Sequence, residues 1–97
     1  DLRDMGTRVA HQVTGQMMDY IQIDEDFALV ETRVPRDVVG QTLQQAQLRS
    51  RYKVTVVSIK PPGGTFTYTA PDTYLDKGAT VLVAGPKAAV ERFAAAT

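Results

Sequence analysis

The chain has 97 residues, of which 43% are hydrophobic and 23% are charged, and it contains no cysteine. This length fits one small globular domain, and the missing cysteines exclude disulfides, thiolate nucleophiles and cysteine metal sites. Eleven basic residues balance eleven acidic ones, so the sequence lacks the broad positive field that attracts nucleic acids and anionic membranes.

The N-terminal stretch carries apolar side chains at steps of three and four residues, which is the pattern of an amphipathic helix. We therefore expect a leading helix over residues 2–20, broken near Gly6 and Gly15 because glycine lowers helix propensity. The sequence begins without methionine and already inside this pattern, so we expect a fragment of a longer protein. An acidic turn at residues 24–26 follows. The apolar stripe consists of Leu2, Met5, Val9, Val13, Met17 and Tyr20.

The segment after the acidic turn predicts a strand and then a helix. Residues Phe27–Val34 are rich in β-branched and aromatic side chains, which is typical of a half-buried strand. Pro35 ends this strand, and helical spacing of apolar residues predicts a short helix over Arg36–Gln47, with Gly40 separating a lead-in turn from it. One face of the strand would carry Ala28, Val30, Thr32 and Val34, and the residues at helical spacing in the helix are Val39, Leu43 and Ala46.

The strongest strand signal of the chain is Lys53–Lys60. The turn residues Pro61–Gly64 lead from it into Thr65–Thr69, so we expect these two segments to form an antiparallel hairpin. The nearly continuous apolar run Thr80–Ala84 predicts a central strand that is buried on both faces. Pro86 then begins a last helix, because proline suits the first helical position. Its core-facing residues would be Ala89, Val90 and Phe93.

The expected order of elements is a leading helix, then strand, helix, strand, strand, strand and helix. Strands that alternate with helices in a short chain favour one sheet with helices packed on it. We therefore predict an α/β domain with a small mixed sheet.

Side chains that perform catalysis are scarce. His11 is the single histidine, and we expect a structural or surface role for it. Neither Ser50 nor Ser58 lies in a Gly-x-Ser-x-Gly elbow, and the sequence contains no glycine-rich phosphate loop. The longest apolar runs are far shorter than the about 20 residues that cross a bilayer. We therefore expect neither an enzyme nor direct insertion into a membrane.

Two clusters of charge have simple interpretations as solvated surface. The acidic residues Asp24, Glu25 and Asp26 lack the spacing of a calcium loop. The basic residues occur around the strongest strand, and arginine can bind phosphate oxygens through two hydrogen bonds. Solvent exposure is nevertheless the favoured interpretation of this group. Its members are Arg49, Arg51, Lys53 and Lys60.

An ordered series of short motifs resembles a known family. The series comprises Val34-Pro35, Val39-Gly40-Gln41-Thr42-Leu43, Leu48-Arg49-Ser50-Arg51-Tyr52-Lys53-Val54-Thr55-Val56-Val57-Ser58-Ile59-Lys60, Pro71-Asp72-Thr73, Leu75-Asp76-Lys77-Gly78 and Val81-Leu82-Val83-Ala84-Gly85-Pro86. It resembles the C-terminal domain of RCK proteins, also called the TrkA-C domain, from about Phe27 to Phe93. The resemblance implies a regulatory domain over residues 27–97. Residues 1–26 would then be a helical linker from a preceding nucleotide-binding RCK domain.

The resemblance also implies a function in potassium transport. Similar domains belong to the cytoplasmic gating subunits of bacterial Ktr and Trk potassium-uptake systems, which act on a membrane transporter. They form homodimers, and several bind cyclic di-AMP in the cleft between two copies. A twofold-symmetric ligand suits such an interface, because each subunit supplies the same half-site. By resemblance, the residues of the half-site map to Val57, Ile59, Lys60, Phe66, Thr69, Ala70 and Pro86.

Relatives commonly carry glycine at the position of Lys53. If the backbone is left-handed there, lysine adds local strain of about 1 kcal/mol.

Two other functions stay open at this point. The domain could be a structural dimerisation module without a ligand, or it could regulate a potassium channel or a cation/proton antiporter in response to divalent cations. Asp24 and Asp26 would be the residues that sense the cation in the second case. In each case the expected location is the cytoplasm, peripheral to the inner membrane through the transporter partner.

Overall fold

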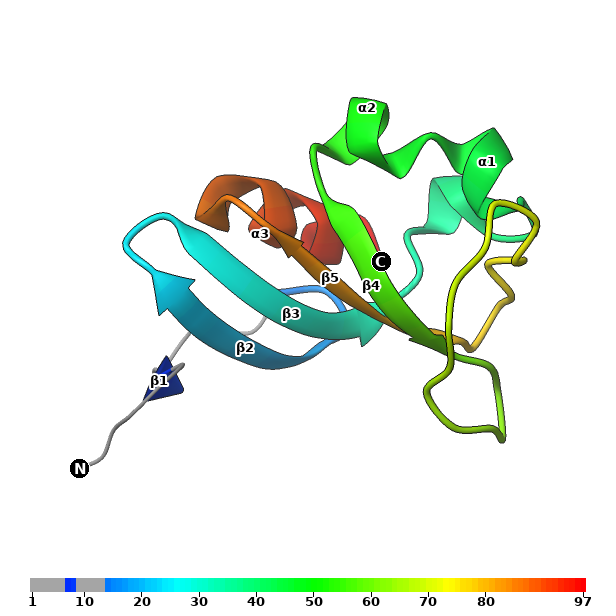
Figure 1. The fold of residues 1–97 in the computed structure, drawn as a ribbon, viewed down its shortest axis with the longest axis horizontal. Coiled ribbons are helices and arrows are strands. Elements are labelled where there is room, and N and C mark those ends of the chain that lie inside the picture. Colours follow the sequence, from blue (N-terminus) through cyan, green and yellow to red (C-terminus); the bar gives the residue numbers. More distant parts are fainter. Residues whose placement is uncertain (1–6, 9–13) are drawn as a thin grey trace.

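The computed structural model describes residues 7–8 and 14–97, which form one sheet with helices on it (Figure 1). A 3-10 turn, η1, and two short helices precede the fourth strand, and a longer helix ends the described chain. The elements are β1 (Thr7–Arg8), β2 (Met17–Asp24), β3 (Phe27–Arg33), η1 (Arg36–Val38), α1 (Leu43–Ala46), α2 (Leu48–Tyr52), β4 (Thr55–Lys60), β5 (Thr80–Gly85) and α3 (Lys87–Ala95).

The sheet has the strand order β1-β2-β3-β5-β4, and every neighbouring pair is antiparallel. The predicted α/β class is confirmed, but the described sheet is not mixed. β3 and β4 do run parallel to each other, since each is antiparallel to β5. They are not neighbours, because β5 lies between them and removes the parallel contact.

The predicted leading helix is wrong where the structure describes it. Met17–Asp24 is the strand β2, which pairs with β3 across a tight turn at residues 25–26. A bulge between Met17 and Asp19 explains the misleading spacing, because it places Met17 and Tyr20 on the same buried face although they are three residues apart. The chain does turn at Gly15, as expected. The predicted helix at residues 2–6 and 9–13, including Gly6 and His11, lies outside the described residues.

The crossover from β3 to β4 is divided into short pieces. β3 has the expected alternation, with Ala28, Val30 and Thr32 fully buried. The predicted helix over Arg36–Gln47 becomes η1, a turn and α1, and α2 then continues to Tyr52, beyond the predicted end. Gly40 has a φ of +89° in the turn, which is the separation that we predicted.

The predicted hairpin after β4 is wrong for its second strand. Residues 65–69 make one bridge with β4, at Ile59 and Thr67. The chain then leaves the sheet because it docks on α1, where the Leu43 and Gln44 amides donate to carbonyl oxygens of the loop, 2.9 Å away in both cases. Leu75 is completely buried and anchors the loop. The loop from 61 to 79 therefore covers the end of the domain instead of extending the sheet.

The core lies between α3 and one face of the sheet (Figure 1). The three residues predicted to face it from α3 are buried. The rings of Phe93 and Tyr52 pack edge to face, with their centroids 5.2 Å apart. β5 is the expected inner strand between β3 and β4. It is not buried on both faces, because Leu82 and Ala84 are half-exposed on the side away from the helix. The largest wholly buried core residues are Phe93, Leu75, Val30, Val38, Val81, Val83 and Val90.

Candidate functional site

The predicted ligand residues gather mainly along the outer edge of β4. Ile59 is 2% exposed and points into the core, whereas Val57 is 49% exposed. The difference follows from a bulge between Val56 and Ser58, which leaves Val57 as an extra residue that does not pair with β5. Val57 therefore offers an apolar side chain to solvent, while Ile59 supports the strand from beneath.

A cation and an aromatic ring meet at the end of β4. The Lys60 ammonium lies 5.4 Å from the centroid of the Phe66 ring, within the range of a cation–π interaction. The turn that brings them together is closed by the Gly64 amide, which donates to the Pro61 carbonyl at 2.9 Å. Gly63 supplies its positive φ of +74°. Lys60 and Phe66 thus place a positive charge next to an apolar ring.

Sequence analysis missed two exposed aromatic residues in this region. Tyr68 is 94% exposed and Tyr74 is 59% exposed. The signal for Tyr68 was present, since Phe66 and Tyr68 are two residues apart and an extended chain places such residues on one side. Phe66 and Tyr68 thus leave aromatic surface in solvent on both sides of Thr67, which bridges β4.

The polar part of the predicted site is already engaged within the chain. The Ala70 amide donates to the Thr73 hydroxyl at 2.9 Å, and the Ala70 carbonyl accepts from the Thr73 amide at 3.0 Å. Thr69 is half-buried beside this turn. The Ser58 hydroxyl donates to the Thr67 carbonyl at 2.7 Å, so it stabilises the loop and is not poised as a nucleophile.

Pro86 does not join the other predicted residues within one chain. It follows Gly85 at the end of β5, whereas Lys60 pairs with Thr80 at the beginning of that strand. Six residues of extended chain separate the two ends, which corresponds to about 20 Å. A shared site would require Pro86 from a second copy.

The basic residues around α2 are separated by the fold. Arg51 forms an ion pair with Asp37 at 3.1 Å, and Lys53 ends α2 with a left-handed backbone, the conformation in which lysine adds local strain. Arg49 lies beside a shallow recess of about 260 Å³ at the start of β4. No common phosphate site therefore unites Arg49, Arg51 and Lys53 with Lys60 in the described part of the chain.

Asp37 also fixes the position of the Tyr52 side chain. The Tyr52 hydroxyl donates to Asp37 Oδ1 at 2.9 Å. Burial, followed by this hydrogen bond, raises the pKa of Tyr52 above its usual 10.0. The Arg92 guanidinium lies 5.7 Å from the centre of the same ring. This network connects α2 with η1 and α3 and stabilises their packing.

The acidic turn holds no cluster of metal ligands. Asp24 Oδ1 accepts the Glu25 amide at 2.8 Å, as an exposed turn residue commonly does. Across residues 7–8 and 14–97, no three histidine, cysteine or acidic side chains are placed to share an ion. In the same residues, no helix is both long enough and apolar enough to cross a membrane.

Comparison with known proteins relates this chain to potassium uptake proteins. The family model of the TrkA-C domain matches residues 29–97. The Ktr system potassium uptake protein C of Bacillus subtilis (strain 168) is 36% identical over 59 residues, which are 60% of this chain and 27% of that protein. Protein A of the same system and organism is 23% identical over 92 residues, 94% of this chain and 41% of that protein. The chain thus spans less than half the length of these relatives.

Solved structures share the fold. The crystal structure of the GsuK RCK domain matches 84% of this chain and 19% of its own chain, with a TM-score of 0.65 and 21% identity. The structure of the GsuK channel bound to NAD matches 71% of this chain and 13% of its own chain, with a TM-score of 0.62 and 24% identity. At these identities the likeness establishes the fold alone.

Proposed function

Because this chain belongs to the TrkA-C domain family, we propose that it is the non-catalytic regulatory domain of a potassium-transport gating subunit and binds cyclic di-AMP between two copies. Two relatives, Ktr system potassium uptake proteins A and C, support the link to potassium transport. The domain would act in the cytoplasm and reach the membrane through its transporter partner. Residues 1–26, which include strand β2 of the same sheet, would lead into the domain from a nucleotide-binding RCK domain.

The exposed apolar surface at the outer edge of β4 carries this proposal. Val57, Phe66 and Tyr68 are 49%, 41% and 94% exposed, although full burial of one such side chain would contribute about 2 kcal/mol. Soluble domains that leave apolar side chains together on their surface commonly use them for binding. A second copy related by a twofold axis would cover this edge and bring another half-site with it.

The chemistry of the edge suits an adenine and a phosphate. Val57 and Phe66 would form the wall for the adenine ring, and the Lys60 ammonium would approach a phosphate oxygen. The Thr69 hydroxyl would supply a hydrogen bond, with Ala70 beside it. Ile59 would support this apolar wall from the core side of β4. Pro86 would close the site from the partner subunit.

Binding of the dinucleotide would regulate the transporter by selecting one arrangement of the dimer. Such coupling requires only that the ligand has different affinities for two arrangements. Because one neighbour of known structure is a channel bound to NAD, NAD is the second nucleotide to compare with cyclic di-AMP.

Calorimetric titration with cyclic di-AMP tests the proposal. We expect Phe66→Ala to weaken binding about tenfold, because the ring would lose its contact with the ligand. Phe27→Ala is the matched control, since Phe27 is 44% exposed but lies in the β2–β3 hairpin. The proposal fails if the unmodified chain shows no binding up to about 1 mM ligand, or if both variants weaken binding equally.

A dimerisation domain without ligand is the second candidate. The observation that favours it is the closed turn at Ala70 and Thr73, in which the backbone groups of Ala70 already have partners. This candidate predicts a dimer whose melting temperature is unchanged by cyclic di-AMP or NAD. The same calorimetric and melting measurements therefore separate the two functions.

A further inference from the structure

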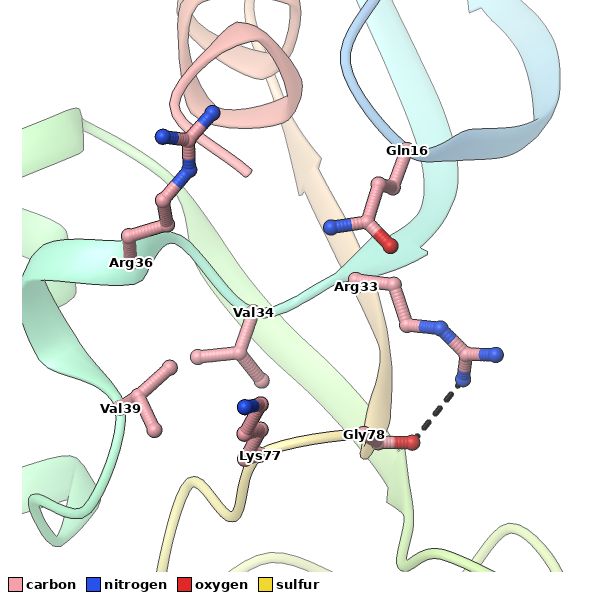
Figure 2. A pocket seen from close by; sticks show the side chains of 7 residues that line it. All are labelled: Gln16, Arg33, Val34, Arg36, Val39, Lys77 and Gly78. Atoms are coloured by element: carbon pink, nitrogen blue, oxygen red, sulfur yellow. Dashed lines mark hydrogen bonds between the residues drawn. The ribbon is translucent and has the colours of Figure 1, made fainter.

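We propose that a second pocket, separate from the β4 edge, binds a small molecule through its phosphate group. The pocket has a volume of about 500 Å³ and lies between the end of β3, η1 and the loop before β5 (Figure 2). Its volume falls within the range of small-molecule sites. The cations that line it are Arg33, Arg36 and Lys77.

Two of the cationic residues lie three positions apart in the sequence, and the third belongs to a distant segment. Figure 2 shows the guanidinium groups of Arg33 and Arg36 directed to opposite sides of the pocket. Arg33 ends β3, Arg36 begins η1, and Lys77 belongs to the loop before β5. The lining contains no carboxylate, and none of the three cations forms an ion pair with a carboxylate of the described residues. An anion in the pocket would therefore be attracted by these positive charges without repulsion from a lining carboxylate.

Arg33 is already held in position. Its Nη1 donates to the Gly78 carbonyl at 2.9 Å and to the Thr80 hydroxyl at 2.8 Å. These acceptors are neutral, so they orient the guanidinium without cancelling its charge. A guanidinium has five N–H donors in a fixed plane, and the remaining ones are available to an anion. Binding would therefore require little further ordering of this side chain.

The other lining residues complete a site for a small organic phosphate. Figure 2 shows the Gln16 side chain extending into the pocket from the β2 side and the Lys77 ammonium close to Val34. The backbone amide of Gln16 donates a hydrogen bond to the Thr97 hydroxyl at 2.8 Å, which fixes the position of Gln16. Val34 and Val39 give the pocket apolar walls. A carbon skeleton would lie against these valines, with the charged group among the cations.

A phosphate fits the charge of this pocket better than a single carboxylate does. Arg33 and Lys77 line the pocket with two positive charges, and a phosphate monoester or a diphosphate carries about two or more negative charges near neutral pH. Arginine also matches the geometry of phosphate oxygens through paired hydrogen bonds. None of the residues assigned to cyclic di-AMP lines this pocket, so the inference does not depend on the function proposed above.

Titration with pyrophosphate, followed by chemical shifts of the intact chain, tests the site. We expect the amide signals of residues 77 and 78 to move on addition of pyrophosphate. Lys77→Gln should raise the dissociation constant about tenfold, because one charge-assisted hydrogen bond is lost. Lys87→Gln removes the same charge at the start of α3, outside the pocket, and should leave the constant unchanged.

Several further results decide whether the pocket is a phosphate site. Absence of shifts up to about 10 mM pyrophosphate, or equal weakening by the two lysine variants, would overturn the site. Binding of acetate as tightly as of pyrophosphate would overturn its phosphate preference. Lys60→Gln should not change the affinity for pyrophosphate, which keeps this test independent of cyclic di-AMP.

Glycerol phosphate and vesicles containing phosphatidic acid then distinguish a soluble source of the phosphate from a lipid headgroup. Lys77-dependent binding of either one supports the site.

Discussion

Lys53 occupies a backbone conformation that suits glycine. It follows α2 with a φ of 63° and a ψ of 34°, where a Cβ atom costs about 1 kcal/mol. We therefore expect Lys53→Gly to raise the free energy of unfolding by about 1 kcal/mol, as measured by urea denaturation. Lys53→Ala keeps the Cβ and is the control. Equal stabilisation by both substitutions would show that the charge, and not the backbone, is responsible.

Tyr52 should make the free energy of unfolding depend on pH in the alkaline range. Burial and the Asp37 hydrogen bond raise its pKa above 10.0 in the folded state, so the folded chain retains the phenolic proton more strongly than the unfolded chain does. The resulting stabilisation is complete below pH 10.0 and is lost as the pH rises through the folded pKa. We expect Tyr52→Phe to cost about 1 kcal/mol at neutral pH and to make the alkaline decline shallower.

The loss of stability at alkaline pH should not disappear in Tyr52→Phe, because burial also raises the pKa of Tyr20. Urea denaturation at several pH values measures the effect. Tyr74→Phe changes a side chain that is 59% exposed and should leave the stability at neutral pH unchanged. An unchanged decline in Tyr52→Phe would contradict the role given to the Asp37 contact.

Single residues differ in how well the sequence alone reveals them. The resemblance to a family with glycine at position 53 raised a left-handed backbone for Lys53 only as a condition, and the structure establishes it. The contact of Tyr52 with Asp37 was not predictable, because the two residues are 15 positions apart and no local pattern connects them. The pocket lined by Arg33 and Lys77 was missed for the same reason, since these residues line one space only after β3 and β5 have paired.

The N-terminal end of β2 is docked on the end of α3 through Gly15. Its φ is +54°, and a Cβ there would collide with the Ala94 carbonyl oxygen and approach the Thr97 hydroxyl to 2.7 Å. We expect Gly15→Ala to destabilise the fold by about 3 kcal/mol, from backbone strain and overpacking together. Gly63→Ala, at a φ of +74° with no atom within 4 Å, should cost only about 1 kcal/mol. Thermal or urea unfolding of both variants provides the comparison, and equal losses would exclude the docking contact.

Elements were predictable where one periodicity dominated. β3 and α3 kept a regular pattern of buried residues, so their position and their core faces agreed with expectation. β2 was mistaken for a helix because its bulge produces a three-residue spacing of buried side chains. The segment 65–69 alternates like a strand, but hydrogen bonds to α1 draw the chain after it away from the sheet. Tertiary contacts decided both cases.

At the scale of the whole molecule, the candidate site is incomplete in one copy. Val57, Lys60 and Phe66 share the β4 edge, whereas Pro86 lies beyond the far end of β5. The sequence could suggest these residues only through family resemblance, because no motif of their own marks them. A symmetric dimer would supply the missing side and bury the exposed aromatic surface at the same time.

The number of ligands bound per chain tests this account most directly. Calorimetric titration with cyclic di-AMP, with the mass of the complex determined by sedimentation, gives both the stoichiometry and the assembly state. We predict one cyclic di-AMP for every two chains, bound to a dimer. One ligand on each monomer, or a dimer that binds none, would contradict the shared site.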